Sequence, residues 1–216
     1  MTNPNAKFEK DLLKQYKYIC GVDEVGVGCL AGPVVACAVL LDKKTLQKII
    51  SLDLPIRDSK QLSAKQRETI THEIKKQKIK YCICYSLPRT IDRLNIYQVS
   101  RSTMKRAVKK ALQLYSSKAL QLKTMVLVDG PRELDKLPYT QKAIIKGDSK
   151  VFSIAIASII AKVFRDKMMG KYAKKYPQYG FERHKGYGTT YHVAQLALYG
   201  STKIHRVSFA PVTKVL

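Results

Sequence analysis

The sequence contains no tryptophan, and only 16 of its 216 residues are Asp or Glu. It also lacks any apolar run near the roughly 20 residues that a membrane-spanning helix needs. Its start, MTNPNAKFEKDLLKQYKY, has no apolar segment of the kind found in secretory signals, so we expect a cytoplasmic protein that does not enter a membrane. Repeats, low-complexity stretches and long linkers are missing too, which argues against a repeat architecture or a string of modules.

Cysteine is scarce and carries no metal-binding pattern. The five cysteines form no CxxC pair, whereas zinc sites need several thiolates or imidazoles that converge. Cys82 and Cys84 alternate in an apolar, strand-like run, YCICY. Cys20, Cys29, Cys37, Cys82 and Cys84 are therefore interpreted as small buried hydrophobes in a reducing compartment.

Positive charge is what the chain has in excess. Lys and Arg number 40, which gives a net charge of +24, and they are spread along the chain rather than held in one tail. Such a surface attracts polyanions, of which nucleic acid is the commonest in a cell. A solvated, Lys-rich surface without a specific partner is the alternative.

Apolar runs alternate with segments of helical periodicity, which is typical of an α/β protein with a mixed sheet. The hydrophobic fraction of 45% and the length suffice for one domain with a proper core, alone or with a small appendage. A glycine-punctuated turn is expected over 25–32 and a loop over 58–63. Strands are predicted over 17–22, 33–41, 78–87, 124–128 and 143–146, and helices over 64–76 (N-capped by Ser63), 90–114 (one helix or two) and 152–169 (buried on most faces).

Four of the few carboxylates stand at the ends of predicted strands. Asp23 and Glu24 lie where a strand gives way to the glycine turn. Asp129 ends a second strand, and Asp148 follows a third. An ordinary ion pair with Lys or Arg would explain any one of them. If the strand ends meet at one edge of the sheet, however, the like charges repel one another unless a cation neutralises them.

A hard divalent ion is the cation that such a group selects, because Mg²⁺ and Mn²⁺ prefer oxygen ligands. Two such ions about 4 Å apart can activate a water and stabilise the leaving oxygen of a phosphodiester. Together with the basic surface, the acidic pattern therefore indicates metal-assisted phosphodiester hydrolysis.

Seven segments of the chain resemble type 2 ribonuclease H, ribonuclease HII, and they occur in that family's order over nearly the whole sequence. They are GVDEVGVGCLAGPVV (21–35), DSKQLS (58–63), DRLNI (92–96), LVDGP (127–131), KGDSKVFSIAIASIIAKVFRD (146–166), HKGYGT (184–189) and HRVSF (205–209). The resemblance implies an α/β, ribonuclease H-like fold with a mixed five-stranded sheet flanked by helices. It also implies a catalytic domain over 1–170 and a helical C-terminal extension over 171–216 that packs on it and contacts substrate.

The implied activity is that of a metal-dependent endonuclease. The enzyme would hydrolyse the RNA strand of RNA–DNA hybrids and cut 5′ of ribonucleotides embedded in duplex DNA, leaving a 3′-hydroxyl and a 5′-phosphate. By the same resemblance, two Mg²⁺ or Mn²⁺ ions are held across the scissile phosphate by Asp23, Glu24, Asp129 and Asp148. A monomer is expected.

Further residues match the family's substrate contacts. Tyr187 matches the tyrosine that packs on the deoxyribose following the last ribonucleotide, where a flat ring fits a sugar without a 2′-hydroxyl. The backbone of Gly26, Val27 and Gly28 is expected to read the ribose 2′-hydroxyl, which needs no side chain. Contacts to phosphate are expected from Ser59, Lys60, His184, Lys185 and Arg206. Capping of their loop is the alternative for Ser59 and Lys60, and simple solvation for Lys185.

Three polar residues of the 146–166 segment are interpreted as structural. Asp166 lies outside the four carboxylates and is taken as an acid near Arg165 that is either on the helix surface or ion-paired. Ser153 and Ser158 are expected to pack, with their hydroxyls satisfied within the helix.

The chain departs from the family's pattern at two positions of the glycine turn. Val27 stands where the family usually has Arg, and Cys29 where it usually has Pro. Valine cannot replace a fork of charged donors near ribose and phosphate. We therefore expect cleavage at a single embedded ribonucleotide to be weakened more than cleavage of a continuous hybrid; altered or lower activity overall is the alternative.

Three rival classes are weighed against this prediction. Type 3 ribonuclease H also lacks the arginine, but it typically carries an extra N-terminal domain, whereas only about 16 residues precede the first predicted strand here. A non-catalytic nucleic-acid-binding protein would have no use for four acids facing a phosphate. A nuclease that cuts only DNA would need no reader of the 2′-hydroxyl.

Overall fold

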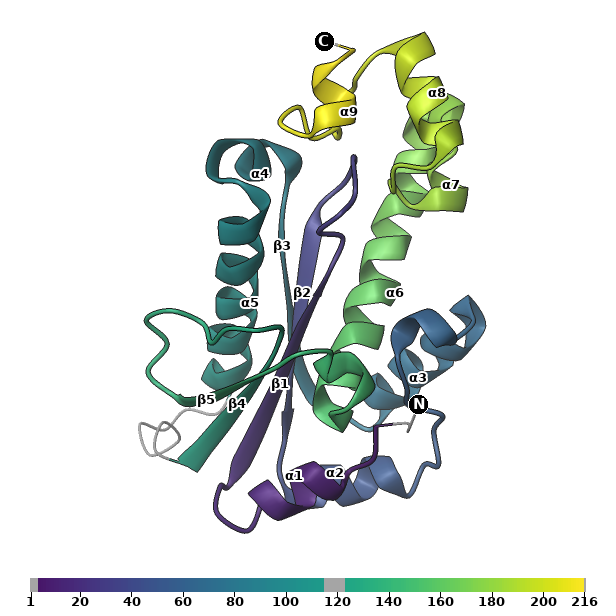
Figure 1. The fold of residues 1–216 in the computed structure, drawn as a ribbon. Helices are drawn as coiled ribbons and strands as arrows, with labels where there is room; N and C mark the ends of the chain where they lie inside the picture. The colour runs from purple at the N-terminus through teal and green to yellow at the C-terminus, as the bar shows by residue number, and fades with distance from the viewer. Residues whose placement is uncertain (1–3, 115–122, 216) are drawn as a thin grey trace.

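A mixed sheet forms the centre of the molecule (Figure 1). The structure, a computed structural model, describes residues 4–114 and 123–215. The strands lie in the order β3-β2-β1-β4-β5, with β2 antiparallel to β1 and β3, and β4 parallel to β1 and β5. Their bounds are β1 Tyr18–Val25, β2 Val34–Leu41, β3 Lys80–Ser86, β4 Thr124–Asp129 and β5 Thr140–Ile144. The predicted mixed five-stranded fold is confirmed.

Helices cover both faces of the sheet, because its central strands are apolar on both sides. Every residue of β2 is buried, and successive side chains of a strand point to opposite faces. Val35 and Val39 pack in the core that includes α6, whereas Ala36 and Leu40 pack in the core that includes α5. The helices are α1 Lys7–Leu12, α2 Lys43–Ile50, α3 Ala64–Lys76, α4 Pro88–Leu94, α5 Ile96–Gln113, α6 Phe152–Lys175, α7 Phe181–His184, α8 Thr190–Tyr199 and α9 Ala210–Thr213.

Local signals in the sequence explain two of the helix starts. The Ser63 hydroxyl accepts a hydrogen bond from the Gln66 backbone N–H, and the Gln66 side chain accepts one from the Ser63 backbone N–H. This capping box begins α3 where the sequence predicts it. The predicted helical stretch 90–114 divides into α4 and α5 at Asn95, whose φ is +63° and whose side chain accepts from the Gln98 N–H.

Other elements differ from the sequence prediction. The strand predicted over 143–146 is instead β5, so Ile145 and Lys146 lie outside it. This strand is at the edge of the sheet and only partly buried, so its sequence shows no apolar run. Helices α1 and α2 are not predicted, although Asp42 and Thr45 form a capping box at the start of α2.

The long helix α6 lies against one face of the sheet and continues beyond it toward α7 and α8 (Figure 1). It continues to Lys175, past the predicted end at residue 169. The predicted domain boundary at residue 170 falls inside this helix, and the division into 1–170 and 171–216 stays a prediction. The C-terminal helices share a small core that includes Met169, Phe181 and Leu196. No helix in the described ranges is both long and apolar enough to cross a membrane.

Candidate active site

Four carboxylates from three elements meet at one end of the sheet. Asp23 and Glu24 lie near the end of β1, and Asp129 is the last residue of β4. These strands run parallel, and Val22 pairs with Val128, so Asp23 and Asp129 follow at the same level. Asp148 lies in η3, the short 3-10 helix Gly147–Ser149 that follows β5. We call these four residues the acidic quartet.

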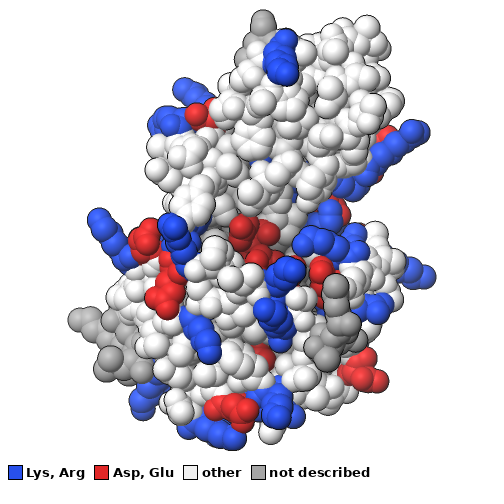
Figure 2. Space-filling view, viewed as in Figure 1, with Lys and Arg blue, Asp and Glu red and all other residues white. Residues whose placement is uncertain are grey.

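The quartet lines a cleft of about 260 Å³. Figure 2 shows acidic side chains gathered near the middle of one face, with Lys and Arg side chains around them. The cleft brings together most of the residues that the sequence predicts for the site. Its lining is Asp23, Glu24, Val25, Gly26, Val27, Gly28, Ser59, Lys60, Asp129, Asp148, Ser158, Lys162 and Tyr187.

The carboxylates lie close enough to disturb one another's ionisation. Burial, and then the charges of Glu24 and Asp129, raise the pKa of Asp23 well above its usual range. Burial and the charge of Asp129 raise the pKa of Glu24 to about 7. Burial also raises the pKa of Asp129. Without a cation, carboxyl groups with raised pKa values at such close quarters favour a partly protonated state.

Asp129 is held in place by a close backbone contact. The N–H of Gly147 donates to Asp129 Oδ1 at 2.6 Å. A Cβ at Gly147 would lie 2.7 Å from Ile154 Cδ1 and 3.1 Å from Asp129 Oδ1, so a larger residue there would push this backbone away from the carboxylate. Lys60 Nζ lies 3.5 Å from Asp148 Oδ2, but 78% of the lysine side chain is exposed, so this pair contributes little to stability.

The donor set is suited to a cation, but the side chains are not tightly gathered around one point. Glu24 Oε2 is buried with no hydrogen-bond partner. Among residues 4–114 and 123–215, no three Asp, Glu, His or Cys side chains form a group that could hold a metal ion as they stand. The strand ends therefore place the quartet in one cleft, with its carboxylates spread around the walls rather than gathered at one point.

Ionisation of the quartet should cost stability as the pH rises. The pKa of Glu24 moves from 4.5 to about 7 on folding, so between these values the folded chain binds more protons than the unfolded chain. The free energy of unfolding therefore falls as pH rises through this window. We compare the Tm of wild type and of Glu24→Gln by calorimetry with EDTA. Between pH 4.5 and 7, the Tm of the variant should rise by about 2–6 °C relative to that of wild type, because glutamine does not ionise. A constant difference would contradict the raised pKa.

The glycine turn is clamped from beneath by a buried arginine. Arg206 donates from Nη2 to the Gly26 carbonyl at 2.6 Å and from Nη1 to the Val27 carbonyl at 2.7 Å, and it also donates to the Gly32 carbonyl. Burial lowers the pKa of Arg206 to about 10. Because the side chain is fully buried, the predicted contact between Arg206 and a backbone phosphate is wrong. Its guanidinium shapes the turn that would meet the ribose.

A second buried arginine, not singled out in the sequence, completes this clamp. Arg165 of α6 donates to the carbonyls of Ala31, Pro33 and Lys185. Gly26, with φ of +96°, leaves room for it, since a Cβ there would lie 2.2 Å from Arg165 Nε. Arg165 therefore ties the glycine turn to the HKGYGT segment across more than 130 residues of sequence.

Tyr187 stands at the rim of the cleft, where the sequence predicts it. The residue is 40% exposed, and its backbone forms an isolated antiparallel bridge with Cys29. The Lys162 ammonium and the Arg165 guanidinium lie 5.9 and 5.8 Å from the ring centroid. Both cations lie within the range of a cation–π interaction with the ring, and Tyr187 lines the cleft.

Three other side chains that are predicted to contact phosphate already have partners within the protein. Ser59 is buried, and its hydroxyl lies 3.1 Å from that of Ser158, which favours the loop-holding alternative for Ser59. His184 has both ring nitrogens engaged, one with the Tyr179 carbonyl and one with the Gly186 N–H. Lys185 donates from its ammonium to the Glu182 carbonyl and does not line the cleft.

The three residues interpreted as structural have partners outside their own helix. The Ser158 hydroxyl lies 3.1 Å from that of Ser59, outside α6, so its predicted satisfaction within the helix is wrong. The same correction applies to Ser153, whose N–H and hydroxyl both donate to the buried Glu9 of α1. Of the two alternatives for Asp166, the ion-paired one is confirmed, since its carboxylate pairs with Lys162 and Arg67.

One signal in the sequence would have found the missed residues. Ser158, Lys162 and Arg165 recur at spacings of four and three, so they share one face of α6. Polar residues on one face of an otherwise apolar helix point to a polar site. Here Ser158 and Lys162 line the cleft, and Arg165 holds the glycine turn through the Ala31 carbonyl.

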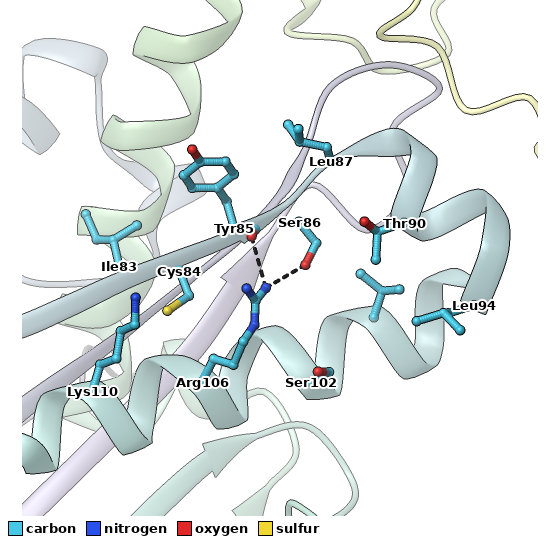
Figure 3. Close-up of a pocket in the computed structure, with 11 residues that line it drawn as sticks. Ile83, Cys84, Tyr85, Ser86, Leu87, Thr90, Leu94, Ser102, Arg106 and Lys110 are labelled. Atoms are coloured by element: carbon cyan, nitrogen blue, oxygen red, sulfur yellow. Dashed lines mark hydrogen bonds between the residues drawn. The ribbon is translucent and has the colours of Figure 1, made fainter.

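A larger pocket lies elsewhere, at the β3 edge of the sheet (Figure 3). It holds about 460 Å³ and is lined by residues of β3, α4 and α5. Within it, Arg106 donates to the Tyr85 carbonyl at 2.9 Å and to the Ser86 hydroxyl. No member of the quartet lines it, so the chemistry of the lining, rather than size, identifies the candidate active site.

The fold and the acidic cleft place the chain among the ribonuclease H-like nucleases. The chain belongs to the ribonuclease HII family, whose model matches residues 20–212. It is 45% identical to ribonuclease HII of Acholeplasma laidlawii over 217 residues, which cover 100% of this chain and 99% of that protein. It is therefore an endonuclease of the ribonuclease H type, which acts on RNA–DNA hybrids.

Solved structures agree with the family. Ribonuclease H2 from Pyrococcus horikoshii superposes with a TM-score of 0.72 at 26% identity, covering 92% of this chain and 96% of that one. Bst-RNase HIII, solved in complex with Mn²⁺, superposes with a TM-score of 0.70 over 94% of this chain and 71% of that one. At 18% identity, the second likeness shows a shared fold.

Proposed function

We propose that this member of the family hydrolyses the RNA strand of RNA–DNA hybrids and also cuts 5′ of ribonucleotides embedded in duplex DNA. Its products would carry a 3′-hydroxyl and a 5′-phosphate, and it would act as a monomer in the cytoplasm. The observation that carries the proposal is the cleft, which joins the acidic quartet to a glycine turn and a half-exposed tyrosine.

The quartet fits hard divalent cations. It supplies only oxygen donors, one of which is buried without a partner, and the raised pKa values of Asp23, Glu24 and Asp129 favour a neutralising charge. Two Mg²⁺ or Mn²⁺ ions held by these four residues would activate a water and stabilise the leaving oxygen of the phosphodiester. The Mn²⁺ complex of Bst-RNase HIII, which shares the fold, supports this choice of ions.

Residues around the quartet would contact different parts of the nucleic acid. Lys60 and Lys162 line the cleft and would attract the phosphates of the nucleic acid. Gly28 is exposed, and a Cβ at this position would meet no atom within 4 Å, so a ribose can approach the backbone of the turn. The exposed part of the Tyr187 ring would pack on the following deoxyribose, where a 2′-hydroxyl would crowd it.

Cleavage of labelled duplexes tests this function. The substrates are a continuous RNA–DNA hybrid, a DNA duplex with one embedded ribonucleotide, double-stranded RNA and DNA alone, each with Mg²⁺, Mn²⁺ or EDTA. We expect cleavage of the first two with a metal ion only, with a 5′-phosphate on the downstream product. Cleavage of DNA alone, or cleavage that survives EDTA, would overturn the proposal.

Val27→Arg should add a contact to the substrate that valine cannot make. The Val27 side chain is 37% exposed and lines the cleft, so an arginine there can donate to the ribose and phosphate. We expect kcat/KM on the single-ribonucleotide duplex to rise by about tenfold, with a smaller change on the continuous hybrid. Val207→Arg, which adds the same charge at an equally exposed valine outside the cleft, is the matched control. Equal gains on both substrates, or no gain, would contradict the prediction.

A further inference from the structure

Three of the four histidines gather beneath Tyr187, away from the acidic quartet. His192 Nε2 lies 3.1 Å from His205 Nε2, and the rings of His184 and His192 stack with centroids 4.5 Å apart. Both His192 and His205 are buried. We call these three residues the histidine cluster. The contacts assigned to the quartet, the glycine turn and the Tyr187 ring do not use it.

Backbone groups at the ends of the cluster fix where each proton lies. The Thr202 N–H donates to His205 Nδ1 at 2.9 Å, so Nδ1 is an acceptor and a neutral His205 carries its proton on Nε2. That proton can only point to His192 Nε2, which must then accept it. His192 therefore carries its proton on Nδ1, and Nδ1 lies 2.8 Å from the Tyr187 carbonyl.

The same reasoning fixes the third ring. The Gly186 N–H donates to His184 Nδ1 at 3.2 Å, and His184 Nε2 lies 2.7 Å from the Tyr179 carbonyl. His184 thus carries its proton on Nε2. Burial lowers the pKa of His192 and of His205 to about 4, which keeps both rings neutral at neutral pH.

The ordered protons link two parts of the proposed substrate site. The hydrogen bonds from His205 through His192 form a chain that we call the relay. One end of the relay is the Tyr187 carbonyl. The other end lies in the 202–206 segment, where His205 bridges to Ala31 and Arg206 clamps the carbonyls of Gly26 and Val27. The relay thus fixes the backbone beneath the tyrosine ring relative to the glycine turn.

We propose that His192 and His205 are positioning residues that set Tyr187 for recognition of the deoxyribose, through a hydrogen-bond relay with one defined tautomer at each ring. The role in recognition rests on the proposed function of Tyr187. The tautomers do not, because they follow from the backbone contacts alone.

Nitrogen-15 NMR of the histidine rings in the full chain at neutral pH tests the relay directly. We expect His184 and His205 in the Nε2–H form and His192 in the Nδ1–H form, with the exposed His72 as an internal reference. An Nε2–H form at His192, or averaged tautomers at His192 and His205, would overturn the relay whatever the activity of the protein.

A matched pair of variants tests the positioning role. In His192→Asn the amide N–H₂ takes the place of Nδ1–H and can still donate to the Tyr187 carbonyl, whereas in His192→Gln the amide reaches the Nε2 position instead. We expect KM on the single-ribonucleotide duplex to rise about tenfold in His192→Gln, with kcat nearly unchanged, and to rise less than threefold in His192→Asn.

Tyr187→Ala supplies the background that separates positioning from general damage. With the ring removed, His192→Gln should raise KM no further. Equal losses in the two His192 variants, or a full additional loss in the Tyr187→Ala background, would overturn the positioning role. If the wild type does not cut the embedded ribonucleotide at all, the proposed function fails, while the NMR result still decides the relay.

Discussion

Asp129→Asn should reduce kcat on a continuous RNA–DNA hybrid by about 10³-fold or more while leaving hybrid binding within a few-fold of wild type. Asparagine has nearly the same shape and can still accept the hydrogen bond from the Gly147 N–H. It removes the negative charge that the proposed metal ions require. The measurements are single-turnover cleavage with Mg²⁺ and fluorescence anisotropy of the hybrid in EDTA.

Asp135→Asn is the control for this substitution. It makes the same chemical change at a carboxylate whose side chain is 87% exposed and which does not line the cleft. Its cleavage rate should match that of wild type. Because Asp129→Asn relieves repulsion among buried carboxylates, its Tm should not fall. An Asp129→Asn protein that cuts at the wild-type rate would remove this residue from the active site.

Arg206→Met should destabilise the protein by about 3 kcal/mol, which corresponds to a fall in Tm of about 6–12 °C for a chain of this size. Methionine fills similar space but leaves the carbonyls of Gly26, Val27 and Gly32 without the donors that they have now. Unpaired buried carbonyls are costly, and the loss of the guanidinium itself offsets only part of this cost. Calorimetry measures the effect.

Two further variants separate shape from charge in this clamp. Arg206→Lys keeps the charge but cannot span three carbonyls, so its Tm should lie between those of wild type and Arg206→Met. Arg183→Met removes an arginine whose side chain is 80% exposed, and its Tm should stay within about 2 °C of wild type. A loss in Arg183→Met equal to that in Arg206→Met would mean that net charge, rather than the clamp, is responsible.

The central strands and the quartet could be predicted from the sequence because their signals are local. Apolar runs mark β1, β2 and β4, and Asp23, Glu24 and Asp129 stand where the runs of β1 and β4 end. Strand β5 was misplaced because an edge strand of partly exposed residues has no apolar run to detect. Helix α2 carries a capping box of Asp42 and Thr45 in its sequence, so its start is encoded locally although its short apolar pattern does not predict it.

The contacts that hold the glycine turn could not be predicted in the same way. The resemblance of the HRVSF segment predicts a phosphate contact for Arg206, and only its burial against Gly26 and Val27 reveals the other role. The carbonyls that it meets lie about 180 residues away in sequence. No periodicity or composition encodes such a pairing.

Helix α6 fixes the spacing between the acidic quartet and the glycine turn. Its Ser158 lines the cleft beside Asp23, and its Arg165, two turns further on, holds the glycine turn and the HKGYGT segment. At a rise of 1.5 Å per residue, Ser158 and Arg165 are about 10 Å apart along the axis of a rigid helix. The distance between the acidic quartet and the glycine turn is therefore set by the rise of this helix. Related enzymes that cut at a different offset from the junction should differ in the length or register of this helix.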